Sequence, residues 1–545
     1  MSSVIGSLST TQIAALTTTA VAALTTTDIQ ALSSTQAAAL TSTQVGVMST
    51  TQLRTLSTTQ MGALTTTSVG ALTSTSFGAL ATTQIAGLTS TQVGGLTTTQ
   101  LGGLVTTQLN KLTTTQVGAL TTTQVGALST SQMVGITATQ IGSLSTTQVA
   151  GLTSTQLGSL STTQVKGLES TDLATLTTTQ VSGLKATQLG ALGTTQVGAL
   201  STTQIGALTT TQLGGMTSTQ VAGLSTSQIG GLTTTQISAL STSQVKGFET
   251  ADLAALTTTQ VGALSSTQLG TLTATQFKGL ESTDLGVLTT TQLGGLTRTQ
   301  LAAMSTTQLA GLTTTQVGVL TTSQVGGLTS SHVAALSTTQ VGALTSTQLG
   351  GLTATQVKGF ETTDLATLTT TQLGGLKSTQ LGALSTSQMG GVSTTQIAAL
   401  TTTQLGGLSS TQVAGLSTTQ VGALTTTQIL GLSATQVKGL ESADVAALTT
   451  TQVGALTTTQ LAALSTTQVK GFETTDVAVL TTTQLGGLSS TQVGALSTTQ
   501  VGSLTTTQVT ALTTGQVGGL TSTQVCKRRR QNPSLKRPSR SVAPE

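Results

Sequence analysis

The segment Leu40-Thr41-Ser42-Thr43-Gln44-Val45 decides the fold, because it contains the start of an eight-residue unit that recurs along nearly the whole chain. From Ser9 to Leu520 the chain consists of 64 consecutive octads without an insertion or deletion. The consensus is Ser/Thr-Thr-Thr-Gln-Val-Gly-Ala-Leu, numbered here as positions one to eight. One octad has only two large apolar residues, so it cannot bury a core by itself. The repeat therefore predicts a solenoid in which each unit packs against its neighbours.

A single continuous α-helix is excluded by the length of the repeat. Eight residues at 3.6 residues per turn move the apolar stripe by about 80° per octad. Such a stripe winds around the helix and faces no single partner. The chain must therefore turn or break once in every octad.

The residues at the start of each octad favour a short helix. Ser or Thr at position one and Gln at position four form the capping-box pattern, in which each side chain hydrogen-bonds to the backbone N–H of the other residue. Leu at position eight and Val at position five have the spacing of a hydrophobic staple around the cap. We therefore predict an all-α solenoid of very short capped helices, one per octapeptide. Helices of this length are unstable alone, so stacking must stabilise them.

Two alternatives remain open, a β-solenoid with 16-residue coils and a disordered or aggregating low-complexity chain. Thr and Val are strand formers, and a coil of two octads has the period of bacterial ice-nucleation repeats. Position six also accepts Gln30, Arg54 and Asn110, so it requires no left-handed backbone. In a straight strand, positions five and eight would point to opposite faces, which argues against the β-solenoid.

Six octad junctions depart from the consensus in the same way, with Lys at position six, Glu at the next position one and Asp at position four. In the helical interpretation the cation follows one helix and the anions begin the next, as the helix dipole favours. We predict solvated ion-pair clusters, with weak cation binding as the alternative. Two carboxylates fall short of the 6–8 oxygens that calcium takes, unless stacking combines sites. The residues are Lys166, Glu169, Asp172, Lys246, Glu249, Asp252, Lys278, Glu281, Asp284, Lys358, Glu361, Asp364, Lys438, Glu441, Asp444, Lys470, Glu473 and Asp476.

The spacing of these clusters bears on the size of a coil, meaning one turn of the chain around the core. Successive clusters are ten, four, ten, ten and four octads apart, always an even number. A coil of two octads would place all six clusters on one face, whereas a coil of three would scatter them. Duplication of a 14-octad block, marked by Phe248, Phe360 and Phe472, explains the even steps equally well.

The composition argues against catalysis. Charged residues make up 6% of the chain, and there is one Cys, one His, no Trp and no Tyr. A single Cys excludes an intrachain disulfide, and a single His excludes a His-based metal site. We expect His332, which replaces Gln at position four, to be a solvent-facing substitution. We expect no catalytic residues, no cofactor and no dedicated metal site.

The charge distribution separates a repeat body from a basic tail. The C-terminal segment 526–545 holds seven cations and one anion, whereas the rest of the chain holds 11 cations and 13 anions. The body has no basic stripe for nucleic acid. We divide the chain into a lead-in at 1–8, an octapeptide solenoid at 9–525 and a basic disordered tail at 526–545. Cys526 is expected to be an exposed thiol that can form intermolecular disulfides.

No membrane span or signal peptide is expected, since no run approaches ~20 apolar residues and the N-terminus lacks a basic segment. The octad Leu-Thr-Thr-Thr-Gln-Val-Gly-Ala-Leu resembles repeat tracts of large bacterial surface or secreted proteins described as adhesins, haem-utilisation proteins or haemolysin-like proteins. The resemblance covers residues 9–525 and implies surface display, for which export without an N-terminal signal stays open. The chain contains no haem-ligand motif, so the resemblance does not imply haem binding.

We predict a non-enzymatic structural repeat protein that serves as an extended spacer, stalk or adhesive surface. The alternative is a repetitive Thr face that binds ice, a glycan or a protein ligand, an interpretation that suits the β-solenoid best. A cell-surface protein or glycan is the partner that the first function implies, and self-association stays open.

Overall fold

The computed structural model describes residues 4–531 of the chain, which divides into two compact units, residues 1–279 and 280–545. Within the described residues all regular structure is helical. There are 64 α-helices and two 3-10 helices, η1 (Val4–Ser7) and η2 (Gln356–Gly359). The all-α solenoid of short helices is confirmed, and residues 4–531 contain no strand from which a β-solenoid could form.

Each octad forms one helix, and its boundaries follow the consensus positions. From α1 (Thr10–Ala14) to α63 (Thr514–Gly519), every α-helix begins at position two and ends at position five, six or seven. The octad 353–360 forms η2 instead. In the octad that begins at Thr41, Thr41 has an extended backbone with φ −72° and ψ 159° before α5 (Ser42–Gly46). This extended residue separates one helix from the next.

The capping box forms as the sequence predicts. The Gln44 backbone N–H donates to Thr41 Oγ1 at 3.3 Å, and the Thr41 backbone N–H donates to Gln44 Oε1 at 2.7 Å. The two bonds satisfy donors that a helix N-terminus otherwise leaves unpaired. No residue among the described ones has a positive φ, glycines included. The turns between helices therefore rely on extended residues at positions eight and one and need no left-handed glycine.

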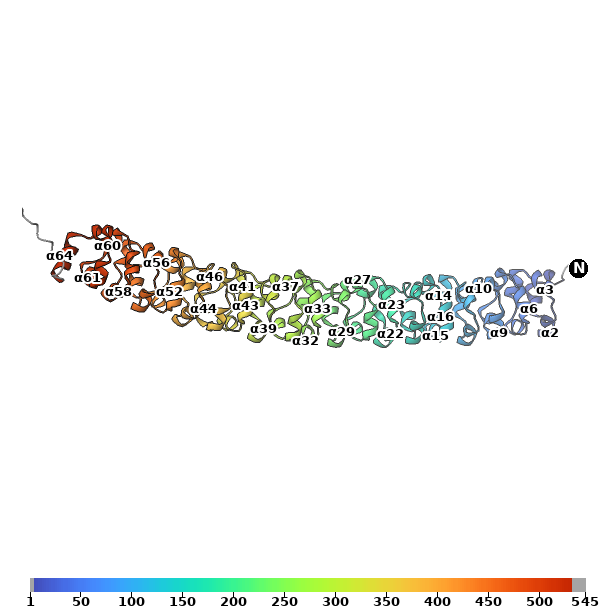
Figure 1. Ribbon diagram of the computed structural model, residues 1–545. Coiled ribbons are helices and arrows are strands. Elements are labelled where there is room, and N and C mark those ends of the chain that lie inside the picture. Colours follow the sequence, from blue (N-terminus) through green and yellow to red (C-terminus); the bar gives the residue numbers. More distant parts are fainter. Residues whose placement is uncertain (1–3, 532–545) are drawn as a thin grey trace, which may run out of the picture. The chain divides into compact units, whose positions relative to one another are not determined.

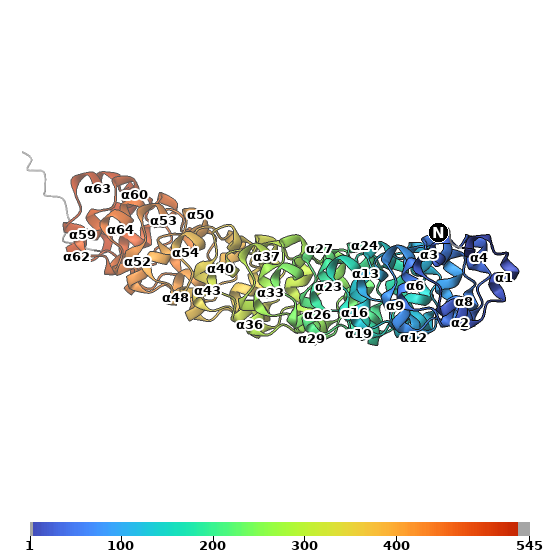
Figure 2. The same ribbon diagram turned by 90° about the vertical axis from the view of Figure 1, so that its right-hand side faces the viewer.

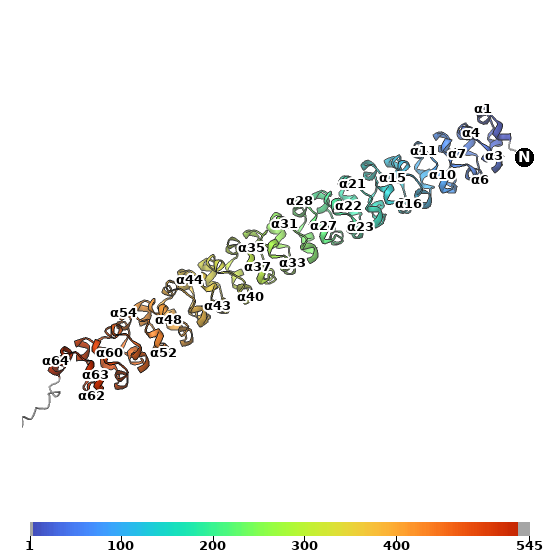
Figure 3. The ribbon, with the colours of Figure 1, turned by 90° about the horizontal axis from the view of Figure 1, so that it is seen from above.

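Successive helices wind around a central core within each unit (Figures 1 and 2). Inside a unit, each helix packs against the third helix before it and the third helix after it, as α2 (Thr18–Ala22) does with α5 and α39 (Thr314–Gly318) with α42 (Thr338–Gly342). Figure 3 shows the same succession of helices from above. A coil thus contains about three octads, so the hypothesis of a two-octad coil is wrong and the even spacing of the charged clusters does not reflect the coil size. Three short helices can enclose a core that two would leave open at the sides.

Positions five and eight build this core. Val245 at position five is fully buried, and Phe248 at position eight is 2% exposed. Because both residues flank the cap, the staple that fixes each helix start also supplies the packing between coils. No helix within residues 4–531 has the length and apolar character needed to cross a membrane.

The two ends of the described chain carry a 3-10 helix before the first octad and a longer α-helix after the last one. In the lead-in, η1 packs against α3 (Thr26–Ala31). The last described helix, α64 (Ser522–Gln531), continues through the boundary expected at residue 526, so residues 526–531 are helical. Cys526 is exposed and has a free thiol, as expected. The remainder of the basic tail, 532–545, lies outside the described residues.

Candidate functional site

Glutamine at position four has a second role that the sequence analysis missed. Gln244 is 2% exposed, and its Nε2 donates to the carbonyl oxygens of Leu213 at 2.7 Å and Met216 at 2.8 Å. These acceptors lie 31 and 28 residues earlier, in the preceding coil. The same bridge recurs in the second unit, where Gln436 donates to Leu405 and Leu408 at 2.7 and 2.9 Å. The amide oxygen thus caps its own helix, and the amide nitrogen joins two coils.

One signal in the sequence points to this role. A capping box admits Glu as readily as Gln at position four. Glu never occurs at that position in the 64 octads, although Gln occupies most of them. A carboxylate provides the capping acceptor but cannot donate to the earlier coil. The strict preference for Gln over Glu therefore reflects the need for an N–H donor.

His332 reproduces both functions of the glutamine, so its prediction as a solvent-facing residue is wrong. Its side chain is 5% exposed. Nδ1 lies 3.2 Å from the Thr329 backbone nitrogen, and Nε2 lies 2.9 Å from the carbonyl oxygen of Met304, 28 residues earlier. Since the carbonyl only accepts and the N–H only donates, these partners select the neutral tautomer with the hydrogen on Nε2. The imidazole is the right length to replace the Gln side chain.

The charged clusters divide into exposed and buried members. The six lysines and six glutamates are exposed. Each Lys lies at the C-terminal end of its helix, and each Glu is the N-cap of the next helix. The six aspartates are 1–3% exposed, so the prediction that the clusters are wholly solvated is wrong for them. Each Asp takes the place of the capping Gln: Asp172 Oδ2 accepts from the Glu169 backbone N–H at 2.9 Å. Ion pairing between Lys and Glu stays a prediction.

Burial raises the pKa of all six cluster aspartates above its ordinary value. At Asp172 the loss of hydration is the largest cause, the hydrogen bond from the Glu169 N–H opposes it, and the Glu169 carboxylate adds to it. The other five have the same balance, and Asp252 also accepts a hydrogen bond from the Thr226 side chain. No lysine is among the causes of these pKa shifts, so the cationic members of the clusters do not compensate the buried carboxylates.

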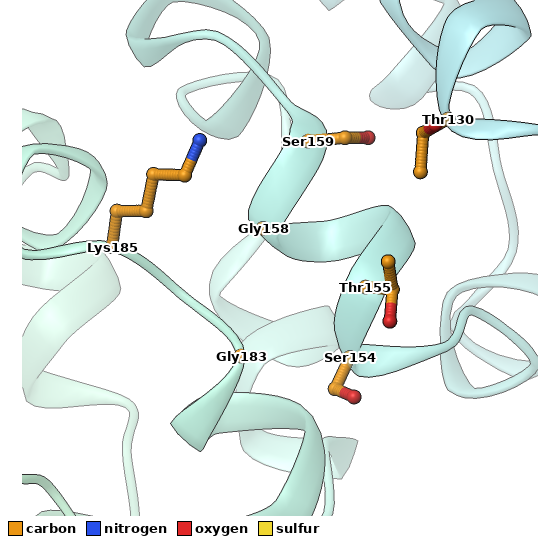
Figure 4. Close-up of a pocket in the computed structure, with 7 residues that line it drawn as sticks. All are labelled: Thr130, Ser154, Thr155, Gly158, Ser159, Gly183 and Lys185. Carbon is orange, nitrogen blue, oxygen red and sulfur yellow. The ribbon is translucent and has the colours of Figure 1, made fainter.

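The surface has shallow grooves rather than deep cavities at the places where hydroxyls gather. One groove of about 410 Å³ runs beside α19 (Ser154–Ser159), with Thr130 on one side and Lys185 on the other (Figure 4). An equivalent groove in the second unit lies beside α43 (Ser346–Gly351) and includes Lys377. No group of three or more His, Cys, Asp or Glu side chains suited to a metal occurs within residues 4–531.

Comparison with known proteins assigns the chain to a family through its repeat. No curated protein matches it. The family model described as the ALTTAQ repeat matches residues 101–130, 165–226, 245–330, 357–434 and 437–506, which together make up more than half of the chain. These segments contain all six charged clusters as well as consensus octads. The chain is therefore a member of the ALTTAQ repeat family.

Proposed function

We propose that this protein is a non-enzymatic structural repeat protein whose helical solenoid serves as an extended spacer or stalk. The observation that carries this proposal is the double use of Gln at position four. Each consensus octad uses its one large polar side chain to cap its helix and to bridge to the preceding coil, as Gln244 does. Every coil is thus hydrogen-bonded to the preceding one, which suits a role as a spacer of defined length.

The outer surface supports the same role. Positions two and three are Thr or Ser in most octads, and these hydroxyls lie toward solvent, partly or fully exposed. A polar surface of this kind keeps a long apolar core in solution without large charge. The flat Thr-x-Thr array that would favour ice binding depends on β-strands, which residues 4–531 lack. We also propose an adhesive role for this surface, which the hydroxyl-lined grooves support.

Small-angle scattering tests the spacer role. The full chain is compared with a variant that lacks residues 177–224, which is six octads or about two coils taken out of the repeat in register. We expect the maximum dimension to fall in proportion to the octads removed while the cross-sectional radius stays constant. A variant with an unchanged maximum dimension, or one with a larger cross-section, would contradict a length-setting function.

A further inference from the structure

Two of the six charged clusters belong to consecutive coils of the second unit. Gln468 Nε2 donates to the Val437 and Leu440 carbonyl oxygens, at 2.9 and 2.5 Å. These bonds hold segment 468–476, which contains one cluster, against segment 437–444, which contains the other. The two clusters are therefore neighbours on the surface.

The backbones of the two coils come closest beside the charged side chains. A Cβ atom on Gly471 would lie 2.2 Å from the Ser442 carbonyl oxygen, which is too close for any residue but glycine. Gly471 follows Lys470 in the chain, and Ser442 follows Glu441. Glycine at this position thus lets the backbone of Lys470 lie beside that of Glu441, across the boundary between the coils.

Together the two clusters form a patch with two columns of charge. On each coil the Lys precedes the Glu by three residues, so Lys438 and Lys470 make one column and Glu441 and Glu473 make the other. We call these four residues the paired-cluster patch. All four side chains are exposed, whereas the aspartates of the same clusters are buried. The six clusters hold 18 of the 24 charged residues that precede residue 526, so the patch lies on a surface with little other charge.

A groove beside the patch gives room for the side chains of a partner. Its volume is about 560 Å³, and its walls include Lys438 and Glu441 on one coil and Ser465 and Thr467 on the next. The Ser and Thr hydroxyls can donate to a carboxylate and accept from an ammonium group. Charged side chains of either sign can therefore enter the groove with a hydrogen-bond partner.

We propose that the paired-cluster patch binds the same patch of a second copy of this chain, about a two-fold axis that runs between the lysine column and the glutamate column. Rotation about this axis lays the lysine column of each copy on the glutamate column of the other, which gives four ion pairs. A second copy presents the opposite charges at the matching spacing by construction, because a two-fold interface uses one patch twice. This inference goes beyond the spacer function and does not depend on it.

The association is weak and depends on salt. Exposed ion pairs contribute little individually, and a network of four lacks the apolar area of an obligate dimer. Complementary charges select the partner and its orientation more than they add affinity. The screening length falls from about 10 Å at 0.1 M salt to about 3 Å at 1 M, so we expect the dissociation constant to rise by about tenfold or more over this range.

Sedimentation equilibrium of the full chain measures this association, with interference optics because the chain has no Trp or Tyr. In a background chain, the lysines and glutamates of the other four clusters are replaced with their consensus residues, Gly for Lys and Thr for Glu. We expect this chain and the parent to form dimers at about 0.5 mM in 0.1 M salt and to dissociate in 1 M salt. The replaced residues are Lys166, Glu169, Lys246, Glu249, Lys278, Glu281, Lys358 and Glu361.

Two charge-reversed variants of the background chain locate the contact. Lys438→Glu with Lys470→Glu makes the patch wholly acidic, and Glu441→Lys with Glu473→Lys makes it wholly basic. Each variant alone should be monomeric, because like charges then face each other across the axis. An equal mixture of the two should form a heterodimer, because the opposite charges are restored.

The chain itself offers the controls for these variants. Lys at position one is compatible with the fold, because Lys185 and Lys377 are N-caps of their helices. Arg54→Glu with Lys111→Glu changes the net charge as much as the acidic variant does, but at exposed residues outside the clusters, and it should leave the dimer intact.

Four outcomes would overturn the proposal. The first is a background chain that stays monomeric at 0.5 mM in 0.1 M salt, which would leave the patch to a different occupant. The second is dimerisation of the charge-reversed variants as strong as that of the background chain, and the third is a mixture that stays monomeric. The fourth is loss of the dimer in the Arg54 and Lys111 control, which would assign the effect to net charge.

Discussion

Gln244→Glu separates the two functions of the position-four side chain. Glu has the same length and can still accept from the Ser241 backbone N–H, a bond that Gln244 makes at 2.9 Å. It loses the two donors that reach Leu213 and Met216 at 2.7 and 2.8 Å, and it places a negative charge against their oxygens. Gln12→Glu is the control, because Gln12 is exposed and its recorded side-chain hydrogen bond joins it to Ser9 alone.

The expected cost follows from the groups left without partners. A buried carbonyl that loses its donor costs about 1–3 kcal/mol, and two are affected at Gln244. The buried charge adds to this, so we expect a loss of about 3–5 kcal/mol in local opening free energy at neutral pH. Gln12→Glu should change stability by less than about 1 kcal/mol, and the helix dipole favours the new carboxylate. Acidification that protonates the new Glu should restore much of the loss at position 244.

Hydrogen exchange read by mass spectrometry is the suitable assay, because a repeat array need not unfold in one cooperative step. Protection of peptides that span residues 213–248 should fall by about 100- to 4,000-fold in Gln244→Glu, since each factor of ten corresponds to about 1.4 kcal/mol. Peptides more than two coils away should be unaffected. Equal effects of the two substitutions, or an unchanged exchange rate around residue 244, would refute the coil bridge.

Four further perturbations test the packing and the buried charges. Gly359→Ala would place its Cβ against the Ser330 carbonyl oxygen and should cost about 1–3 kcal/mol in chemical unfolding. Gly374→Ala at the end of α45 (Thr370–Gly374) meets open space and should stabilise by up to ~1 kcal/mol; a loss there would contradict the geometry. His332→Gln should be nearly neutral by the same measurement, whereas His332→Leu should cost about 1–3 kcal/mol; similar costs would refute the role of His332 in the bridge. Stability should fall as pH rises from the ordinary Asp value of 3.8 through the raised pKa, because the folded chain holds more protons in that window. Replacement of all six cluster aspartates by Gln should remove this dependence in a pH series of thermal midpoints, and a parent that gains stability over the same window would show the opposite sign.

The local structure was predictable because it depends on neighbouring residues. Ser or Thr at position one, Gln at position four and Leu at position eight define the cap, and the helices begin where these residues predict. The even spacing of the charged clusters could not establish the coil size, because block duplication gives the same numbers as a two-octad coil. His332 was misplaced for a related reason: its partner, Met304, lies 28 residues earlier and is not identifiable without the coil geometry.

By itself, the sequence of this protein determines that each octad is a short capped helix and that positions five and eight are its core. These features follow from hydrogen bonds and contacts within a single octad. The tertiary structure decides that a coil holds about three octads, and thus which carbonyls lie above each position-four side chain. It shows Gln to be a bridge between coils, because the amide nitrogen of each Gln lies against a backbone oxygen of the preceding coil, as that of Gln244 does against Met216.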